Sequence, residues 1–328
     1  MTLPKPSKAT ITDVAKAAGV STGTVSRVLN NRPGVKARTK AQVLATIEAL
    51  GYRPDAAARE LSANQGKRVG LHVATGERRM VLIPYFMLFL EHLVEEVQRE
   101  GFRLHQVPSR PDGLPEYLTD GVVLLGAYED DPRVTYLQEA GVPFVLVGHS
   151  DGVRSVAPDD FDGGKQAAAH LLKLGHRDIV HMSGFTNSQA SFDRFRGFKL
   201  VLEGAGLEPP EAHLLDGEFT SLDAYRALRR AYEKGLRFSA VFAASDEMAL
   251  GVIAALEDLG LRVPADVSVV GYDDLPGVAP SLTTVRQDIA QIAAAAVTLL
   301  QEGLRGEPVR RQVMPVQLVV RATSSRKR

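Results

Sequence analysis

The chain has 328 residues, 45% of them hydrophobic, and no cysteine, which excludes disulfides and thiolate metal sites. No apolar run reaches the roughly 20 residues that span a bilayer, and the first residues lack the apolar stretch of a signal peptide, so we expect a cytoplasmic protein without membrane contact. The net charge is zero, but residues 1–68 carry 12 Lys and Arg against 4 Asp and Glu. This basic segment predicts an anion-binding module joined to a body that does not bind anions.

Three short helices are predicted between residues 10 and 52. Thr12 is the expected N-cap of the first helix, Gly19 ends that helix in a sharp turn, and Ser21 caps the second. The third is expected at about residues 36–50, and its apolar face comprises Val43, Leu44, Ile47 and Leu50. Helix, tight glycine turn and helix form the helix-turn-helix pattern, whose second helix enters the major groove of DNA.

An alanine-rich segment of about two turns follows Pro54. It runs from Asp55 to Leu61, and a polar linker continues to Arg68. A helix this short is marginal in water because nucleation is costly. We therefore expect it to form only when something else holds it.

From Val69 onward, apolar strands alternate with longer helices. The helices are expected at residues 84–99, 161–174, 192–203 and 248–259. Continuous apolar strands between helices indicate a parallel sheet covered on both faces, and there are enough strands for two such sheets. Since ligands bind at the carboxyl ends of such strands, the residues just after VGLHVA, FVLVG, HMSG, AAS and VGY are candidates for a ligand site.

Several ordered motifs resemble the LacI/GalR family of bacterial transcription repressors. The stretch ATITDVAKAAGVSTGTVSRVLNNRPGVKARTKAQVLATIEALGYRPDAAARELS is similar to the family's DNA-binding head. The stretches LGHRDIVHMSG, RFRGF, AVFAASDEMALG, GLRVPADVSVVGYDD and PSLTTVRQ are similar to its effector-binding core. The resemblance covers about residues 9–323 and implies a sequence-specific transcriptional regulator, most of all a repressor, whose operator affinity is controlled by a small molecule.

The resemblance also implies the fold. It predicts a small all-α helix-turn-helix head and an α/β core of two doubly wound parallel-sheet subdomains, like the type I periplasmic binding proteins. The expected parts are a head at 1–54, a hinge helix and linker at 55–68, a core at 69–328, one subdomain at about 69–159 and 286–315, and another at about 160–285 and 316–328.

Three residues are expected to read bases in the operator. The resemblance places Thr22 and Gly23 at the positions that choose bases, and Arg27, one turn on, suits a guanine edge or a phosphate. Gly23 has no side chain, which would let the helix approach the groove closely. Backbone phosphates are expected to meet Thr24, Ser26, Asn30, Thr39 and Tyr52, although each of these is also suited to a helix cap or a core edge.

Leu61 is an apolar residue on a polar segment. Proteins that kink DNA push such side chains between base steps in the minor groove. By the resemblance, Leu61, with Ala58 beside it, would form a wedge at the centre of a palindrome; the alternative is that Leu61 packs on the core.

The effector is expected to bind between the two subdomains. The residues that match the family's binding positions are Tyr85, Phe86, Asp160, Arg194, Phe219, Ser245, Asp246, Asp273 and Gln287. Arg194 would otherwise form a structural ion pair, and Asp246 would otherwise cap the helix that follows it. Gly148 lacks the side chain that some sugar-responsive members have there. This set of groups suits a carbohydrate first and a nucleoside second.

The DNA geometry and an apolar helix at 84–99 predict a homodimer on a palindromic double-stranded operator. No cofactor and no metal site are expected, since the histidines lack ligand spacing. Two other classes of protein are compatible with parts of the sequence. An enzyme would use paired carboxylates such as Asp159 and Asp160, and a transport-type sugar-binding protein would need export. The basic head disfavours the second.

Overall fold

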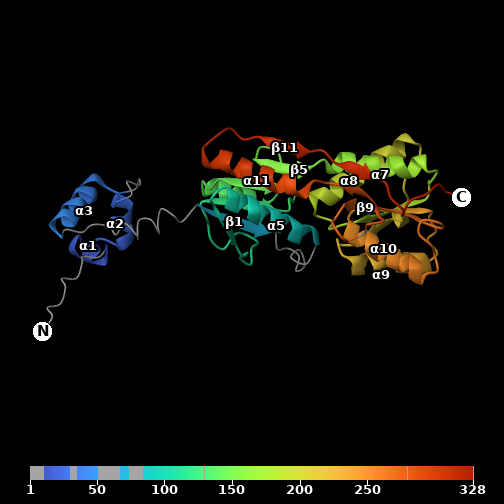
Figure 1. Cartoon of the computed structure of the whole chain (residues 1–328), viewed down its shortest axis with the longest axis horizontal. Helices are drawn as coiled ribbons and strands as arrows, with labels where there is room; N and C mark the ends of the chain where they lie inside the picture. Colours follow the sequence, from blue (N-terminus) through green and yellow to red (C-terminus); the bar gives the residue numbers. More distant parts are fainter. Residues whose placement is uncertain are drawn as a thin grey trace. The chain divides into compact units, whose positions relative to one another are not determined.

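The computed structural model divides into two compact units, Met1–Gly66 and Lys67–Arg328, which we call the head and the core. The structure describes residues 11–29, 35–50, 67–73, 84–128, 130–278 and 280–327. Figure 1 shows helices alone in the described part of the head and two α/β subdomains side by side in the core.

The head contains helices α1 (Ile11–Ala17), α2 (Thr22–Leu29) and α3 (Ala37–Ala49). One small apolar cluster joins the three helices, and its most buried members are Val14, Val25 and Val43. Between α1 and α2 the chain turns sharply at Gly19, whose φ of 62° is strained for other residues. Ser21 caps α2 as predicted, because its Oγ accepts a hydrogen bond from the backbone N–H of Thr24 at 3.2 Å.

Two predicted details of the head were wrong. Thr12 lies inside α1, which begins at Ile11, rather than at its N-cap. Val43 of α3 is buried, but Leu44 and the C-cap residue Leu50 are 47% and 41% exposed. Successive helical residues point about 100° apart, so Leu44 cannot share the direction of Val43.

The first subdomain of the core is built on a six-stranded sheet in the order β11-β5-β4-β3-β1-β2. All of its strand pairs are parallel. Its elements are β1 (Arg68–Val73), α5 (Pro84–Arg99), β2 (Arg103–Gln106), β3 (Gly121–Leu125), α6 (Pro132–Glu139), β4 (Phe144–Val147), β5 (Ser155–Pro158), α11 (Ile289–Leu304) and β11 (Arg311–Met314). Helices α5 and α11 share one apolar cluster with this sheet, and a second cluster includes Leu137 of α6.

The second subdomain has a six-stranded sheet in the order β12-β10-β9-β8-β6-β7, in which only the pair β10–β12 is antiparallel. Its elements are α7 (Asp160–Lys173), β6 (Ile179–Ser183), α8 (Gln189–Gly204), η2 (Glu211–His213), β7 (Leu214–Asp216), α9 (Ser221–Glu233), β8 (Ala240–Ala243), α10 (Asp246–Asp258), β9 (Ser268–Asp273), β10 (Thr283–Arg286) and β12 (Gln317–Val319). One apolar cluster joins the sheet to α9 and α10, and another joins it to α7 and α8.

The chain passes between the two sheets three times. The passages lie between β5 and α7, between β10 and α11, and between β11 and β12. The expected fold class, an all-α head and a core of two parallel-sheet subdomains, is confirmed.

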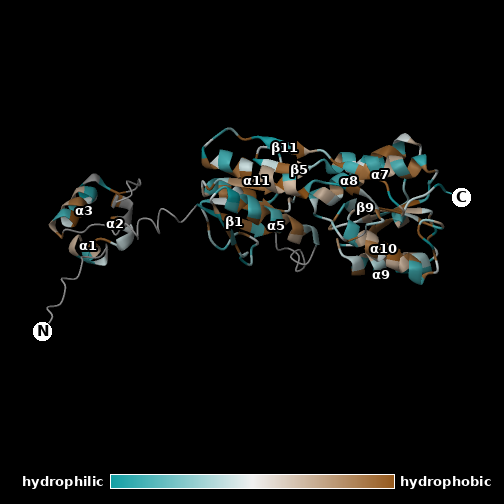
Figure 2. Cartoon of the chain, viewed as in Figure 1, coloured by the Kyte–Doolittle hydropathy of each residue, from teal (hydrophilic) through white to brown (hydrophobic). Residues whose placement is uncertain are grey.

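The core helices are amphipathic, with apolar and polar residues on different sides (Figure 2). Three of them, α6, α9 and α11, were absent from the sequence-based prediction. In α9 only Ala224 and Leu228 are fully buried, so its apolar signal is short. No helix in the described ranges is long and apolar enough to cross a membrane.

Candidate DNA-binding and effector-binding sites

The start of α2 presents a small, open surface. Thr22 and Gly23 are exposed, and a Cβ at Gly23 would meet only the Ser21 Oγ, at 3.7 Å. Thr24 is half-buried, with its hydroxyl 3.0 Å from that of Ser21. The fold of the head therefore does not require a glycine at position 23.

Other predicted DNA contacts fall partly outside the described residues. Thr39 lies in the first turn of α3 and is half-buried. The remaining ones are not described: Asn30, Tyr52, Ala58 and Leu61 as whole residues, and Ser26 and Arg27 in their side chains.

A cavity lies between the two subdomains, at the carboxyl ends of strands from both sheets. Its empty volume, including the mouth that opens to solvent, is about 960 Å³. Eight of the nine predicted effector-binding residues line it: Tyr85, Phe86, Asp160, Arg194, Phe219, Ser245, Asp273 and Gln287.

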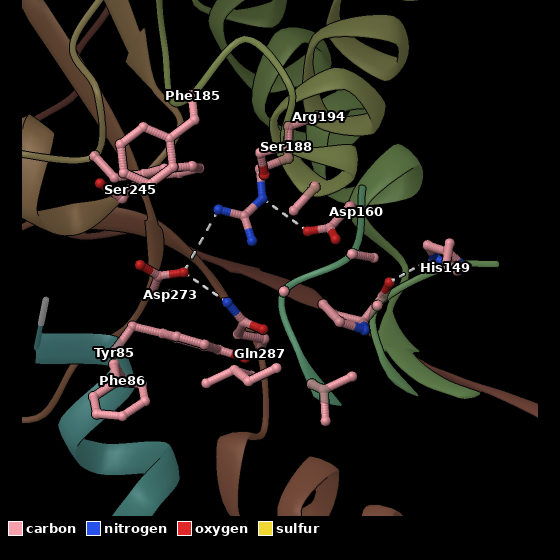
Figure 3. Close-up of a pocket in the computed structure, with 18 of the residues that line it drawn as sticks. Tyr85, Phe86, His149, Asp160, Phe185, Ser188, Arg194, Ser245, Asp273 and Gln287 are labelled. Carbon is pink, nitrogen blue, oxygen red and sulfur yellow. Dashed lines mark hydrogen bonds and ion pairs between the residues drawn. The ribbon is translucent and has the colours of Figure 1, made fainter. Parts of the chain in front are cut away.

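Arg194, from the second turn of α8, lies at the centre of the polar groups (Figure 3). Its Nε donates to Asp160 Oδ1 at 2.7 Å, and its Nη1 donates to the carbonyl oxygen of Ala244 at 2.6 Å. Nη1 also lies 3.7 Å from Asp273 Oδ1, and the guanidinium carbon stands 3.7 Å from the centre of the Tyr272 ring. Burial is the largest single effect and disfavours the charge, but Asp160, Tyr272 and Asp273 together outweigh burial and raise the pKa of Arg194. Arg194 is therefore a permanent buried cation.

Asp273 and Gln287 form a second polar group beside Arg194. Gln287 Nε2 donates to Asp273 Oδ1 at 2.6 Å, and Gln287 Oε1 has no hydrogen-bond partner in the described structure. Burial raises the pKa of Asp273, against the opposing effect of Arg194. Together these groups offer both donors and acceptors to a ligand that fills the cavity.

Aromatic rings form much of the remaining wall. Phe219 and Phe185 stand edge to face, with ring centres 5.3 Å apart and planes at 79°. Phe219 and its neighbour Glu218 have positive φ angles of 52° and 47°, which are uncommon in non-glycine residues. Such strain persists only where the surroundings enforce it, and it often marks binding sites.

Asp246 does not line the cavity, in contrast to the prediction. It is the first residue of α10, and Ser245 precedes it as N-cap, with its Oγ accepting from the backbone N–H of Met248 at 3.2 Å. The two carboxylate oxygens of Asp246 accept from the backbone N–H of Leu275 at 2.8 Å and from Thr284 Oγ1 at 2.6 Å. Asp246 therefore connects α10 to the segments of Leu275 and Thr284.

Sequence reasoning missed several residues of the cavity wall. Phe185 and Ser188 follow β6, and His149 follows β4, with His149 Nε2 3.2 Å from the carbonyl oxygen of Pro158. Their place just after strands was the available signal. Gly148 also lines the cavity; its φ is 143°, and a Cβ there would lie 2.4 Å from that of Ala127, so no side chain fits.

The all-α head and the two-sheet core each match a known group of proteins. Residues 10–55 match the family of bacterial regulatory proteins called the lacI family, and residues 168–324 match the periplasmic binding protein-like domain. This combination defines a DNA-binding transcriptional regulator. Such regulators are not enzymes.

Full-length relatives place the chain more narrowly. It is 35% identical to the HTH-type transcriptional repressor PurR of Mannheimia succiniciproducens, over 95% of this chain and 98% of the relative. It is also 35% identical to the HTH-type transcriptional regulator CelR of Thermobifida fusca, over 95% and 97%. The chain belongs to the lacI family, and it is a DNA-binding transcriptional repressor of that family.

Two solved structures resemble the whole chain. A complex of the regulator CelR with cellobiose is 33% identical and has a TM-score of 0.70, covering 96% of this chain and 99% of the other. The lac repressor dimer bound to operator and the anti-inducer ONPF is 27% identical, also with a TM-score of 0.70, covering 97% and 100%.

Proposed function

We propose that this repressor works as a homodimer in the cytoplasm, binds a palindromic operator, and loses or gains operator affinity when a carbohydrate occupies the core cavity. Thr22, Gly23 and Arg27 read bases. Thr24, Ser26, Asn30, Thr39 and Tyr52 contact the backbone, and Leu61 with Ala58 enters the minor groove. The observation that carries the effector part is the buried Arg194 between two carboxylates in an aromatic-walled cavity.

The cavity chemistry favours a sugar. A hydroxyl group both donates and accepts hydrogen bonds, and the wall offers the donor Arg194 beside the acceptors Asp273 and Gln287. The rings of Phe185 and Phe219 are nearly perpendicular, so they do not form two parallel faces for a flat base. A complex of a similar regulator contains cellobiose.

A nucleobase or nucleoside is the second candidate. It is favoured by the several relatives that carry the name PurR. The direct experiment is selection of binding sites from random DNA by the full-length protein, repeated with cellobiose, glucose, ribose, guanine, hypoxanthine and adenosine.

We expect a palindromic consensus whose affinity changes with a sugar. Phe219→Ala should keep that consensus and lose the response, because it removes an aromatic wall of the cavity. Phe192→Ala is the matched control, since Phe192 is 53% exposed on α8 and does not line the cavity. A response to bases alone would replace the sugar, and the absence of any selected sequence would refute DNA reading by the head.

The coupling we propose is a shift of populations between conformations. Effector binding would change the angle between the subdomains and the spacing of the two hinge segments, residues 55–61 of each subunit. A two-turn helix is marginal alone, so a modest change in spacing would suffice to melt it.

A further inference from the structure

Asp131 and Arg133 form a buried ion pair in the first subdomain, outside the cavity. Their side chains are only 3% and 2% exposed. Arg133 is the largest of the fully buried side chains in the described part of the chain. Removing two charges from water is costly, and an apolar pair often stabilises a fold equally well. A buried pair at this place therefore calls for a role beyond stability.

The guanidinium of Arg133 binds backbone as well as carboxylate. Its Nη2 lies 2.6 Å from Asp131 Oδ2, and its Nε lies 2.9 Å from Oδ1. Nη1 donates to the carbonyl oxygen of Leu125 at 3.3 Å, and Nη2 also donates to that of Gly126. Arg133 thus supplies donors to carbonyl groups at the point where β3 ends.

The segment that Arg133 holds is a wall of the effector cavity. Leu125, Gly126, Ala127 and Tyr128 all line the cavity, whereas neither Asp131 nor Arg133 does. The Tyr128 ring lies over the guanidinium, 5.6 Å from its carbon. Gly126, with a φ of 79°, turns the chain away from the strand. We call residues 125–128 the cavity wall segment.

The cavity wall segment also touches the other subdomain. The carbonyl oxygen of Ala127 accepts a hydrogen bond from the backbone N–H of Gln189 at 3.3 Å. Gln189 is the first residue of α8, the helix that carries Arg194. The position of the wall segment is therefore linked to the helix that presents the central cation.

We propose that Arg133, held by Asp131, is a positioning residue for effector binding: it fixes the cavity wall segment so that the wall and α8 meet across the cleft. This inference rests on the proposed function. Arg133 does not touch the effector; it sets the shape of the site and the contact between the subdomains.

The test compares two double variants of the full-length protein. Arg133→Met with Asp131→Asn removes both charges and keeps the helix cap at position 131. Arg154→Met with Glu302→Gln is the control, because buried Arg154 and partly buried Glu302 form another ion pair of the same subdomain, 3.1 Å apart, that does not line the cavity; Glu302 also pairs with Arg310. With cellobiose as probe, we expect the first variant to bind about tenfold more weakly or worse, and the control to bind as the wild type does.

A single conservative variant separates charge from geometry. Arg133→Lys keeps the ion pair, but its single ammonium nitrogen replaces the planar fork of three nitrogens that reaches the carboxylate and both carbonyl groups. We expect this variant to fold, and we expect its affinity for cellobiose to stay well below that of the wild type. Full recovery of affinity in Arg133→Lys, or equal weakening in both double variants, would overturn the proposal.

Hydrogen exchange of the ligand-free protein gives a readout that does not depend on the sugar. We expect faster exchange in peptides covering residues 121–131 and 186–193 of the Arg133 double variant, and wild-type exchange there in the control. Unchanged exchange at 186–193 would refute the link to α8. If the wild type binds no cellobiose, the choice of that sugar fails, and the exchange data still decide the inference.

Discussion

Gly23 shows how a single residue separates folding from recognition. It lies in the first turn of α2, where glycine costs about 1 kcal/mol relative to alanine, and its neighbourhood is open. Gly23→Ala should therefore stabilise the head by up to about 1 kcal/mol and leave the selected operator unchanged. Gly23→Gln should fold equally well and change the selected bases, because a polar side chain then faces the groove. Binding-site selection and thermal unfolding of the two variants check this prediction. The same consensus for Gly23→Gln as for the wild type would contradict it.

His181 makes stability depend on pH. Its imidazole is fully buried among the rings of Phe195, Phe198 and Phe242, and burial lowers its pKa from 6.5 to about 3. Between these values the unfolded chain binds a proton that the folded chain does not, so the free energy of unfolding falls as the pH falls below 6.5.

The expected loss from His181 is up to about 1.4 kcal/mol per pH unit. Burial also lowers the pKa of His72, to about 4, and adds to the loss. His181→Leu should remove the uptake of about one proton on unfolding between pH 6 and pH 4, so that the free energy of unfolding changes less steeply with pH. Urea unfolding at several pH values measures this, and parallel curves for variant and wild type would refute it.

At the scale of elements, local signals predicted the bounds of helices where the cap is plain. The helix predicted at 84–99 is α5, Pro84–Arg99, because proline suits the first helical position. The helix predicted to start at Met248 instead begins at Asp246, since Ser245 is its N-cap. The sequence predicts that Ser245 and Asp246 both bind the effector; in the structure Ser245 lines the cavity, whereas Asp246 is the first residue of the helix.

The location of Asp246 predicts a structural effect. Asp246→Ala should lower the free energy of unfolding by about 1–3 kcal/mol, because it leaves the partners at Leu275 and Thr284 unsatisfied in a buried place. Cellobiose affinity should change much less than in Phe219→Ala. Denaturation and calorimetry on the same samples test this, and a large loss of affinity with unchanged stability would return Asp246 to the effector site.

At the scale of the whole molecule, the cavity depends on the three passages between the sheets. Arg194 and Asp160 come from the second subdomain, whereas Tyr85 and Gly148 come from the first. A ligand that contacts both subdomains favours the conformation in which they are close, and this differential affinity is what a regulator needs.

The amino-acid sequence predicts the basic head and the α/β core, the helix-turn-helix, the parallel sheets and, through the resemblance to the LacI/GalR family, eight residues of the cavity wall. The head, the core and the sheets follow from charge and apolar periodicity, which are local along the chain, whereas the wall residues follow from motifs that match the family. Folding decides that Asp246 lies outside the cavity wall, which of the residues after the strands join that wall, Phe185, Ser188 and His149 among them, and that Arg133 donates hydrogen bonds to it. These contacts join segments that are distant in sequence and that meet only when the two sheets pack, so no local sequence pattern predicts which residues will be in contact.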